Sequence, residues 1–175
     1  NILDNYRPIS LLPCISKIFE RVVYNQIYAF FEFHKLFYFS QHGFRKKHST
    51  ETATLEFIDK IFNHLDNDKI PIAIFIDLSK AFDTIDHDIL LTKLHFYGVR
   101  GTSLEWFRSY LDNRKQYVFC NNHASSLCLN TVGVPQGSIL GPLLFIIYMN
   151  DICRVSPKFN TILYADDTTL ESPLC

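Results

Sequence analysis

Two adjacent carboxylates, Asp166 and Asp167, lie between two short apolar, β-branched runs. This pattern predicts a tight hairpin with the pair at its turn, so that both side chains can crowd one edge of a sheet. Two like charges at such a site repel and resist ionising together, and a divalent cation would neutralise them. An Asp-Asp pair is also ordinary turn chemistry. The pair alone therefore leaves a metal site and a plain turn both open.

A third carboxylate, Asp77, follows the apolar run Ile70–Ile76. A continuous run of this length, bounded by polar residues, predicts a strand that is buried on both faces. Asp77 would then stand at the C-terminal end of the strand, where a side chain leaves the core and meets a cleft. Taken alone, a capping or strand-terminating aspartate is an equally good interpretation.

A glycine-rich segment, GVPQGSILGPLLF (133–145), leads into an apolar helix. Glycine permits close approach of the backbone, and a helix N-terminus offers free N–H groups to a phosphate or a base. The alternative interpretation is a plain junction between a loop and a helix. The three glycines cost backbone entropy on folding. This cost makes a plain junction a weaker interpretation than a loop that approaches a ligand.

Five segments in this order resemble reverse transcriptases, in particular those of non-LTR (LINE-type) retrotransposons. They read NYRPISLL (5–12), QHGFRKKHST (41–50), FIDLSKAFD (75–83), GVPQGS (133–138) and YADD (164–167). The resemblance implies an α+β fold, consisting of part of the fingers and a ferredoxin-like palm of a right-hand polymerase, with the thumb absent. It places the fingers part in residues 1–68 and the palm part in residues 69–175.

The resemblance also implies an RNA-directed DNA polymerase that serves retrotransposition. A DNA primer 3′-hydroxyl would attack the α-phosphate of a deoxynucleoside triphosphate on an RNA template, with two Mg²⁺ ions, or Mn²⁺ in their place. Asp77 and Asp166 would be the principal metal ligands and catalytic residues, and Asp167 a third, less central acid. Carboxylate oxygens are the ligands that Mg²⁺ prefers.

Further site residues follow from the same resemblance. Nucleotide contacts are expected from Arg45, Phe82, Gln136, Leu78 and Ser79, and template or primer contacts from Gly137 and Tyr164. A guanidinium matches a phosphate, although a basic turn such as 45–47 is also typical of a solvated surface. A bulky ring at Phe82 would exclude a 2′-hydroxyl and so select deoxynucleotides. Ordinary packing at the start of a helix is the competing interpretation of Phe82.

The periodicity of the apolar residues predicts mainly helices around these motifs. In the first half of the chain we expect a long helix from Pro13 with an apolar stripe in the core, a basic loop over 40–49 and a helix over 55–65. A further helix should start at Asp86 or His87 and stop at Gly98, and a short helix should follow over 104–111. The last expected elements are a hairpin of 116–120 with 127–132 around Asn121-Asn122 and a helix after Gly141.

Composition bounds the class of protein. The 175 residues are 47% hydrophobic and 20% charged, which suits one globular domain or part of a larger one. A net charge of −1 gives no bulk attraction to nucleic acid, so a basic face would have to be local. The five cysteines are scattered and odd in number, which favours reduced intracellular thiols over a disulfide framework or a zinc site. The longest apolar stretch, 139–149, is too short to span a membrane.

The chain begins at Asn1, inside a motif, which leads us to expect a fragment of a longer element with a thumb and an endonuclease elsewhere. Two alternatives to an active retrotransposon polymerase remain at this point. One is a catalytically inactive remnant that acts at most as a nucleic-acid-binding module. The other is a reverse transcriptase of the intron-maturase type. The compartment, nucleus or cytoplasm, is left open.

Overall fold

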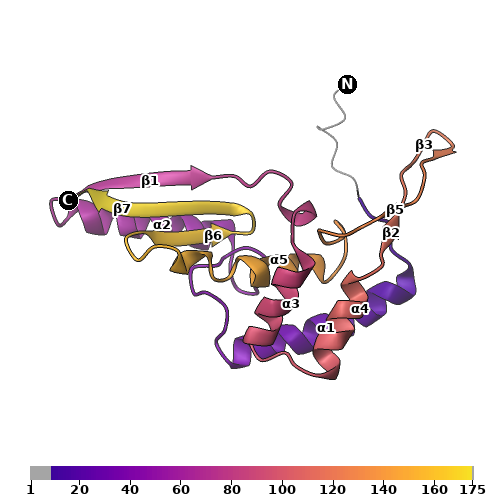
Figure 1. Ribbon diagram of the computed structural model, residues 1–175. Coiled ribbons are helices and arrows are strands. Elements are labelled where there is room, and N and C mark those ends of the chain that lie inside the picture. Colours follow the sequence, from indigo (N-terminus) through magenta and orange to yellow (C-terminus); the bar gives the residue numbers. More distant parts are fainter. Residues whose placement is uncertain (1–8, 175) are drawn as a thin grey trace.

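The computed structural model describes residues 9–174, so the 5–8 part of the first motif and Cys175 lie outside the described residues. A small sheet lies at one side of the molecule and most helices at the other (Figure 1). In chain order the elements are α1 (Cys14–Phe33), α2 (Thr50–Leu65), β1 (Ile70–Ile76), η2 (Ala81–Asp83), α3 (His87–Phe96), α4 (Thr102–Leu111), β2 (Lys115–Gln116), β3 (Phe119–Cys120), β4 (His123–Ala124), β5 (Cys128–Leu129), α5 (Gly141–Met149), η3 (Ile152–Arg154), β6 (Asn160–Tyr164) and β7 (Asp167–Leu174). The predicted mixture of helices and strands is confirmed.

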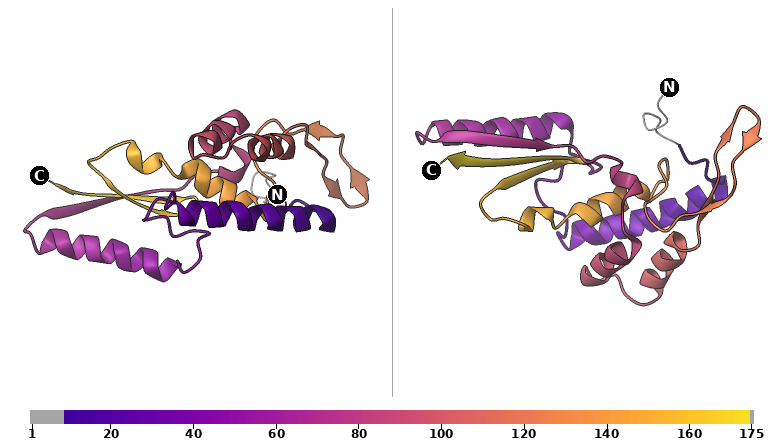
Figure 2. Two further views of the ribbon diagram at one scale, coloured as in Figure 1. Left: turned by 90° about the horizontal axis from the view of Figure 1, so that it is seen from below. Right: turned by 45° about the horizontal axis from the view of Figure 1, so that its top comes forward.

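The principal sheet has the strand order β1-β7-β6, and both pairings are antiparallel. Residues 40–42 run parallel to β6 beyond its free edge, because His42 N donates to Leu163 O at 2.7 Å and Leu163 N donates to Ser40 O at 2.9 Å. Helix α2 lies along one face of the sheet and contacts β1 and β6 (Figure 2). The sheet therefore joins the segment before α2 to the hairpin that carries the paired aspartates.

The hydrophobic core lies among the helices. Helix α5 is its centre, since Leu144, Ile146 and Ile147 are fully buried. The C-terminal half of α1 adds Tyr28 and Phe31, which confirms the predicted core stripe there. The N-terminal half of the same stripe is exposed, however, and consists of Ile15, Ile18, Phe19 and Val22. Among the described residues, no helix is long and apolar enough to cross a membrane.

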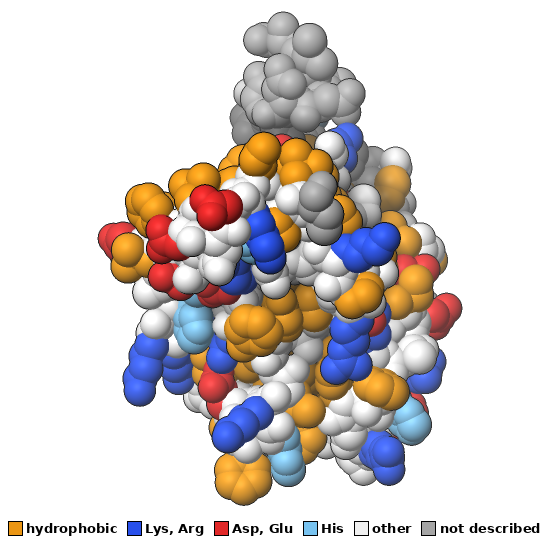
Figure 3. Space-filling view, turned by 90° about the vertical axis from the view of Figure 1, so that its left-hand side faces the viewer, with side chains coloured by type: hydrophobic (Ala, Val, Ile, Leu, Met, Phe, Trp, Pro, Cys, Tyr) orange, Lys and Arg blue, Asp and Glu red, His pale blue; other side chains and the backbone are white. Residues whose placement is uncertain are grey.

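The prediction that β1 is buried on both faces is wrong. Ile70 is 65% exposed, Ile74 45% and Phe75 72%. Strand β1 pairs with β7 along one edge only, and no described strand pairs with its other edge. Pro71, which has no N–H to donate, fits such an edge position. Hydrophobic side chains consequently reach the surface among charged ones on the side of the molecule that Figure 3 presents.

The hairpin predicted over 116–132 is present as two short ladders rather than one. Strand β2 pairs with β5, and β3 pairs with β4 across the turn at Asn121 and Asn122. Both asparagines have positive φ, 49° and 61°, which suits a two-residue turn. The helix predicted to start at Asp86 or His87 is α3, which begins at His87, and its N-cap Asp86 accepts from Ile89 N at 2.9 Å. Pro13 is the residue before α1 rather than its first residue.

Candidate active site

The paired aspartates lie where β6 turns into β7. Tyr164 and Asp167 form the last antiparallel pair, so Ala165 and Asp166 make a two-residue turn. Ala165 has a φ of 57°, the left-handed conformation that such turns need at their first position. Asp166 is half-buried at the turn, and Asp167 is exposed as the first residue of β7.

Asp77 leaves β1 at the same end of the sheet. Ile76 pairs with Thr168, so the next residue along β1 stands at the level of Asp167. The three aspartates therefore share one edge, as the sequence predicted. Among residues 9–174, no side chain donates a hydrogen bond to these carboxylates or forms an ion pair with them.

These carboxylates do not form a closed metal site. Within the described part of the chain, no three His, Cys, Asp or Glu side chains are grouped closely enough to hold an ion. The donor chemistry nevertheless fits Mg²⁺, because carboxylates supply the hard oxygen ligands that this ion takes in polymerase sites. The backbone thus brings the three residues to one edge without gathering their side chains.

The turn is held in place by Gln41 and Gly43. The buried Gln41 Oε1 accepts from Gly43 N at 2.9 Å and from Ala165 N at 3.4 Å. A Cβ on Gly43 would lie 2.0 Å from Ala165 N, so only glycine permits this contact. Sequence reasoning treated the 41–50 motif as a source of Arg45 and missed the positioning role of its first residues. The glycine within the motif was the signal available.

The same loop is fastened to α2 through Glu56. Its carboxylate accepts from Ser40 Oγ at 2.5 Å and from Lys60 Nζ at 2.7 Å, and it lies 2.8 Å from His42 Nε2. Burial by itself would raise the pKa of Glu56, but the hydrogen bonds from Lys60, Ser40 and His42 outweigh it and lower the pKa below its ordinary value. The loop is therefore supported by a carboxylate that stays ionised.

Arg45 lies against α1 rather than beside the aspartates. Its Nη2 is 3.1 Å from Glu32 Oε1 and its Nη1 donates to Tyr38 O at 3.0 Å. The guanidinium carbon lies 5.1 Å from the centre of the Phe37 ring, and the side chain is 11% exposed. The structure thus places this predicted nucleotide-binding residue in contacts within the protein.

The glycine-rich loop docks on the segment after Asp77. Gly133 N donates to Ile85 O at 2.7 Å, and Gln136 Nε2 donates to both carboxylate oxygens of Asp83 at 3.1 and 3.0 Å. Gly133 has a φ of 83°, and a Cβ there would lie 2.8 Å from Asp83 O. The sequence itself indicated no specific role for Asp83. Its bond to Gln136, 53 residues away, joins two of the motifs.

The remaining predicted residues lie around this junction. Phe82 stacks on the buried Phe145 ring at 4.8 Å between centroids and meets the Phe44 ring edge-on at 6.0 Å. The packing interpretation of Phe82 is therefore realised, and its role as a gate stays a prediction. In the link between β1 and η2, Leu78 is half-buried and Ser79 is exposed. Gly137, in the glycine-rich loop, is exposed and has a φ of 94°. Tyr164 is half-buried at the end of β6.

Comparison with known proteins decides the family. The family model described as "Reverse transcriptase (RNA-dependent DNA polymerase)" matches residues 3–173. The chain belongs to the reverse transcriptase family. It is 35% identical over 155 residues to a Drosophila melanogaster protein named "Probable RNA-directed DNA polymerase from transposon BS", covering 85% of this chain and 16% of the relative. It is 31% identical over 175 residues to the RNA-directed DNA polymerase from mobile element jockey of the same species, covering 96% and 19%.

This reverse transcriptase chain thus spans less than a fifth of the length of these relatives. Among solved structures it resembles a telomerase from Candida albicans in complex with a fragment of telomeric RNA, with a TM-score of 0.63 and 14% identity over 91% of this chain and 31% of that one. A telomerase from Candida tropicalis gives a TM-score of 0.62 and 13% identity, over 92% and 29%. At such identities the likeness is one of fold.

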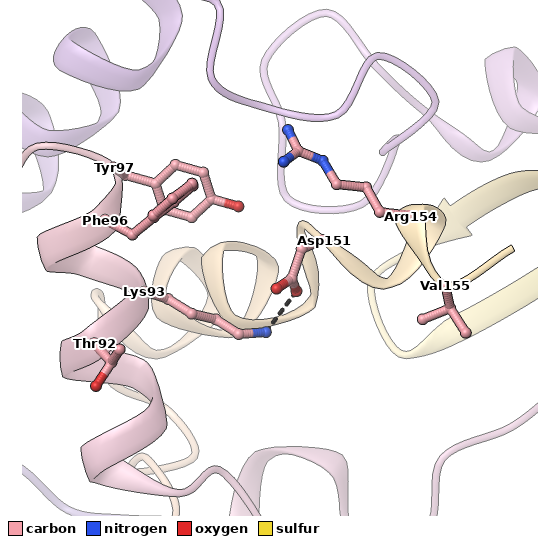
Figure 4. Close-up of a pocket in the computed structure, with 7 residues that line it drawn as sticks. All are labelled: Thr92, Lys93, Phe96, Tyr97, Asp151, Arg154 and Val155. Atoms are coloured by element: carbon pink, nitrogen blue, oxygen red, sulfur yellow. Dashed lines mark hydrogen bonds and ion pairs between the residues drawn. The ribbon is translucent and has the colours of Figure 1, made fainter. Parts of the chain in front are cut away.

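One cavity of the reverse transcriptase, about 430 Å³ in volume, lies away from the candidate site. It is lined by Thr92, Lys93, Phe96, Tyr97, Asp151, Arg154 and Val155 (Figure 4). Lys93 Nζ is 2.5 Å from Asp151 Oδ1 and donates to Tyr148 O at 2.5 Å, so the central charges pair within the protein. None of the predicted site residues lines this cavity.

Proposed function

We propose that the chain catalyses RNA-directed DNA synthesis as part of a non-LTR retrotransposon. A DNA primer paired with an RNA template would be extended by one deoxynucleotide at a time. The bond from the primer O3′ to the α-phosphorus forms as the bond to pyrophosphate breaks. The observation that carries this proposal is the edge shared by Asp77, Asp166 and Asp167, whose carboxylates have no cationic partner among the described residues.

In this proposal the three carboxylates hold two Mg²⁺ ions, or Mn²⁺ in their place. By the resemblance to reverse transcriptases, Asp77 after β1 and Asp166 in the turn between β6 and β7 would be the principal ligands, and Asp167 the weaker third. Two such ions, when bound, stabilise the attacking and leaving oxygens of an in-line displacement. The protein contributes the hard oxygen ligands and a rigid turn, which Gln41 and Gly43 support.

The nucleotide would lie between this edge and the glycine-rich loop. Gln136, fixed by Asp83, would meet the incoming base, and backbone N–H groups at Leu78 and Ser79 would face its phosphates. Phe82 would lie beneath the sugar. Gly137 and Tyr164 are proposed to contact template and primer. Arg45 would bind the triphosphate by exchanging its contact with Glu32 for phosphate oxygens.

The proposal retains the division into a fingers part, residues 1–68, and a palm part, residues 69–175. Most of the length of the relatives lies outside the matched region, and we propose that a thumb and an endonuclease belong to the full-length element. The relatives do not favour the two alternatives, an inactive nucleic-acid-binding remnant and an intron maturase.

Primer extension tests the proposal. The protein in its full natural length is given an RNA template, a DNA primer, deoxynucleotides and Mg²⁺. Asp77→Ala and Asp166→Ala should each lower the extension rate at least about 100-fold, as the loss of a group that stabilises the transition state does. Asp112→Ala, at an exposed position after α4, is the matched control and should leave the rate unchanged. Full extension by the Asp77 or Asp166 variant would refute the assignment.

A further inference from the structure

Glu20 is a buried carboxylate in the N-terminal half of α1, and it takes no part in the candidate active site. Its side chain is 1% exposed. Oε2 accepts from Ile139 N at 2.7 Å and from Leu140 N at 3.3 Å, and Oε1 accepts from Ser16 Oγ at 3.4 Å. No Lys, Arg or His among the described residues forms an ion pair with it. A buried carboxylate is tolerated where hydrogen bonds replace its lost hydration, and here backbone N–H groups supply them.

These two N–H groups lie immediately before α5, on its N-cap residue Leu140 and on the residue that precedes it. The helix begins at Gly141, and its N-cap residue Leu140 provides no side-chain hydrogen bond. The first N–H groups of a helix have no partner within the helix, and its N-terminus favours a negative charge. Glu20 therefore acts as a cap that α1 supplies to α5 from 119 residues away.

The residues just before α5 are fixed by the same arrangement. Ser138 Oγ donates to Pro135 O at 2.8 Å and accepts from Gly141 N at 2.9 Å. At the other end of the loop, Val134 N donates to Phe82 O at 2.8 Å. The stretch that contains Gln136 is thus held at one end by the segment after Asp77 and at the other by the cap from α1.

The surroundings of Glu20 are completed by Tyr110 from α4. Burial first, and the nearby Glu20 charge second, raise the pKa of Tyr110 to about 12. The phenol consequently stays neutral and adds no second charge beside Glu20 and Ser138. A carboxylate in this position has backbone and hydroxyl groups as its neighbours, which suits a fixed structural support better than a group that reacts.

We propose that Glu20 is a positioning residue for the nucleotide site: it holds residues 133–141 in the conformation that presents Gln136 and Gly137 to the incoming nucleotide. This inference rests on the proposed polymerase function. Glu20 itself does not reach the substrate. Its effect should therefore appear in the affinity for the nucleotide more than in the rate of the chemical step.

The test compares Glu20→Ala and Glu20→Gln with Glu105→Ala, an exposed glutamate on α4, in the full-length protein. Glu20→Ala leaves two N–H groups without acceptors and should raise the KM for deoxynucleotide about 10-fold, with kcat changed much less and primer–template affinity unchanged. Glu20→Gln keeps a carbonyl oxygen for the same donors and should restore most of the affinity. Glu105→Ala should resemble the wild type. A KM that Glu20→Ala leaves unchanged would overturn the proposal.

Amide hydrogen exchange provides a readout that does not need catalysis. In Glu20→Ala the amides of Ile139 and Leu140 should exchange faster, while the amide of Leu94 in α3 should keep its protection. If the wild type made no DNA, the polymerase function would fail, and unchanged exchange at 139–140 would separately overturn the role of Glu20. If Glu20→Ala does not fold, Glu20→Asp takes its place. Its shorter chain withdraws the carboxylate from Ile139 N, and the KM for nucleotide must then rise at least about threefold.

Discussion

Strand β1 and helix α5 are both apolar runs, but β1 is largely exposed and α5 is buried. In β1, Ile72, Ile74 and Ile76 are 41%, 45% and 38% exposed. In α5, Ile146 and Ile147 are completely buried. Strand β1 has one paired edge and one helix near it, whereas α5 lies in the middle of the helical core. An apolar run thus indicates that burial of the segment would be favourable, but it does not show which other elements pack against that segment.

The difference in burial between β1 and α5 determines where the charged groups reach the surface. Because β1 ends at the open side of the sheet, Asp77 emerges beside the turn at Asp166 and Asp167 with its carboxylate accessible. Because α5 is enclosed, its N-terminus must be capped from within the protein, and Glu20 supplies that cap. One region presents the charged groups, and the other keeps the adjoining glycine-rich loop in a fixed shape.

A pair of identical substitutions tests the comparison most strongly. Ile146→Ala in α5 should lower the free energy of unfolding by about 2–5 kcal/mol, because it leaves a cavity in a closed core. Ile74→Ala in β1 should cost under about 1 kcal/mol, because the side chain is already half in water. Urea denaturation of the two variants measures both values. Equal losses would show that β1 is as well covered as α5.

The close contact between Gly43 and the aspartate turn should be almost as sensitive. Gly43→Ala puts a methyl group 2.0 Å from Ala165 N, so the backbone must move, at a cost of about 1–3 kcal/mol, and primer extension should fall with it. Gly101→Ala is the comparison, because its added Cβ would meet no atom within 4 Å. Its φ of 58° and ψ of −136° are almost exclusive to glycine, so it should lose about 1–3 kcal/mol of stability through backbone strain while the rate of primer extension stays unchanged. Full activity and stability in Gly43→Ala would show that this contact does not position the aspartate turn.

Substitution of Phe82 distinguishes its packing role in the core from its proposed role in selecting the nucleotide sugar. Phe82→Ala should raise the incorporation of ribonucleotides relative to deoxynucleotides about 10-fold, since one lost steric contact is worth about 1–3 kcal/mol. It should also destabilise the protein, because the ring stacks on Phe145. Parallel extension assays with the two kinds of nucleotide measure the ratio. A loss of stability with an unchanged sugar preference would leave packing as the only role of Phe82.

The smallest expected effect concerns pH and the loop beneath the aspartate turn. The folded-state pKa of Glu56 is lowered from 4.5, so its contribution to stability is complete above about pH 4.5 and is lost as the pH falls through the folded pKa. Glu56→Gln should therefore flatten the acid limb of a plot of unfolding free energy against pH. A limb of unchanged slope would show that other carboxylates account for it.

The sequence predicted the features that local chemistry decides. The helix start near Asp86 and the turn at Asn121 and Asn122 follow from short patterns. The shared edge of Asp77 with the Asp166 turn joins distant segments, and it was expected because the ordered motifs together resemble a polymerase. The features it missed join residues with no local signature. Arg45 pairs with Glu32 across 13 residues, and Gln136 with Asp83 across 53. Such pairs arise only once packing has brought the helices and loops together.

The metal site assigned to Asp77, Asp166 and Asp167 is tested most directly by finding where a divalent ion binds on the chain. NMR spectra would be recorded with substoichiometric Mn²⁺, which broadens the signals of nearby amides. We expect broadening at residues 77–79 and 164–167, at the edge shared by the three aspartates, and its loss in Asp166→Ala. Broadening centred on Asp151 and the cavity beside α3, or broadening at residues 164–167 that survives in Asp166→Ala, would contradict the account.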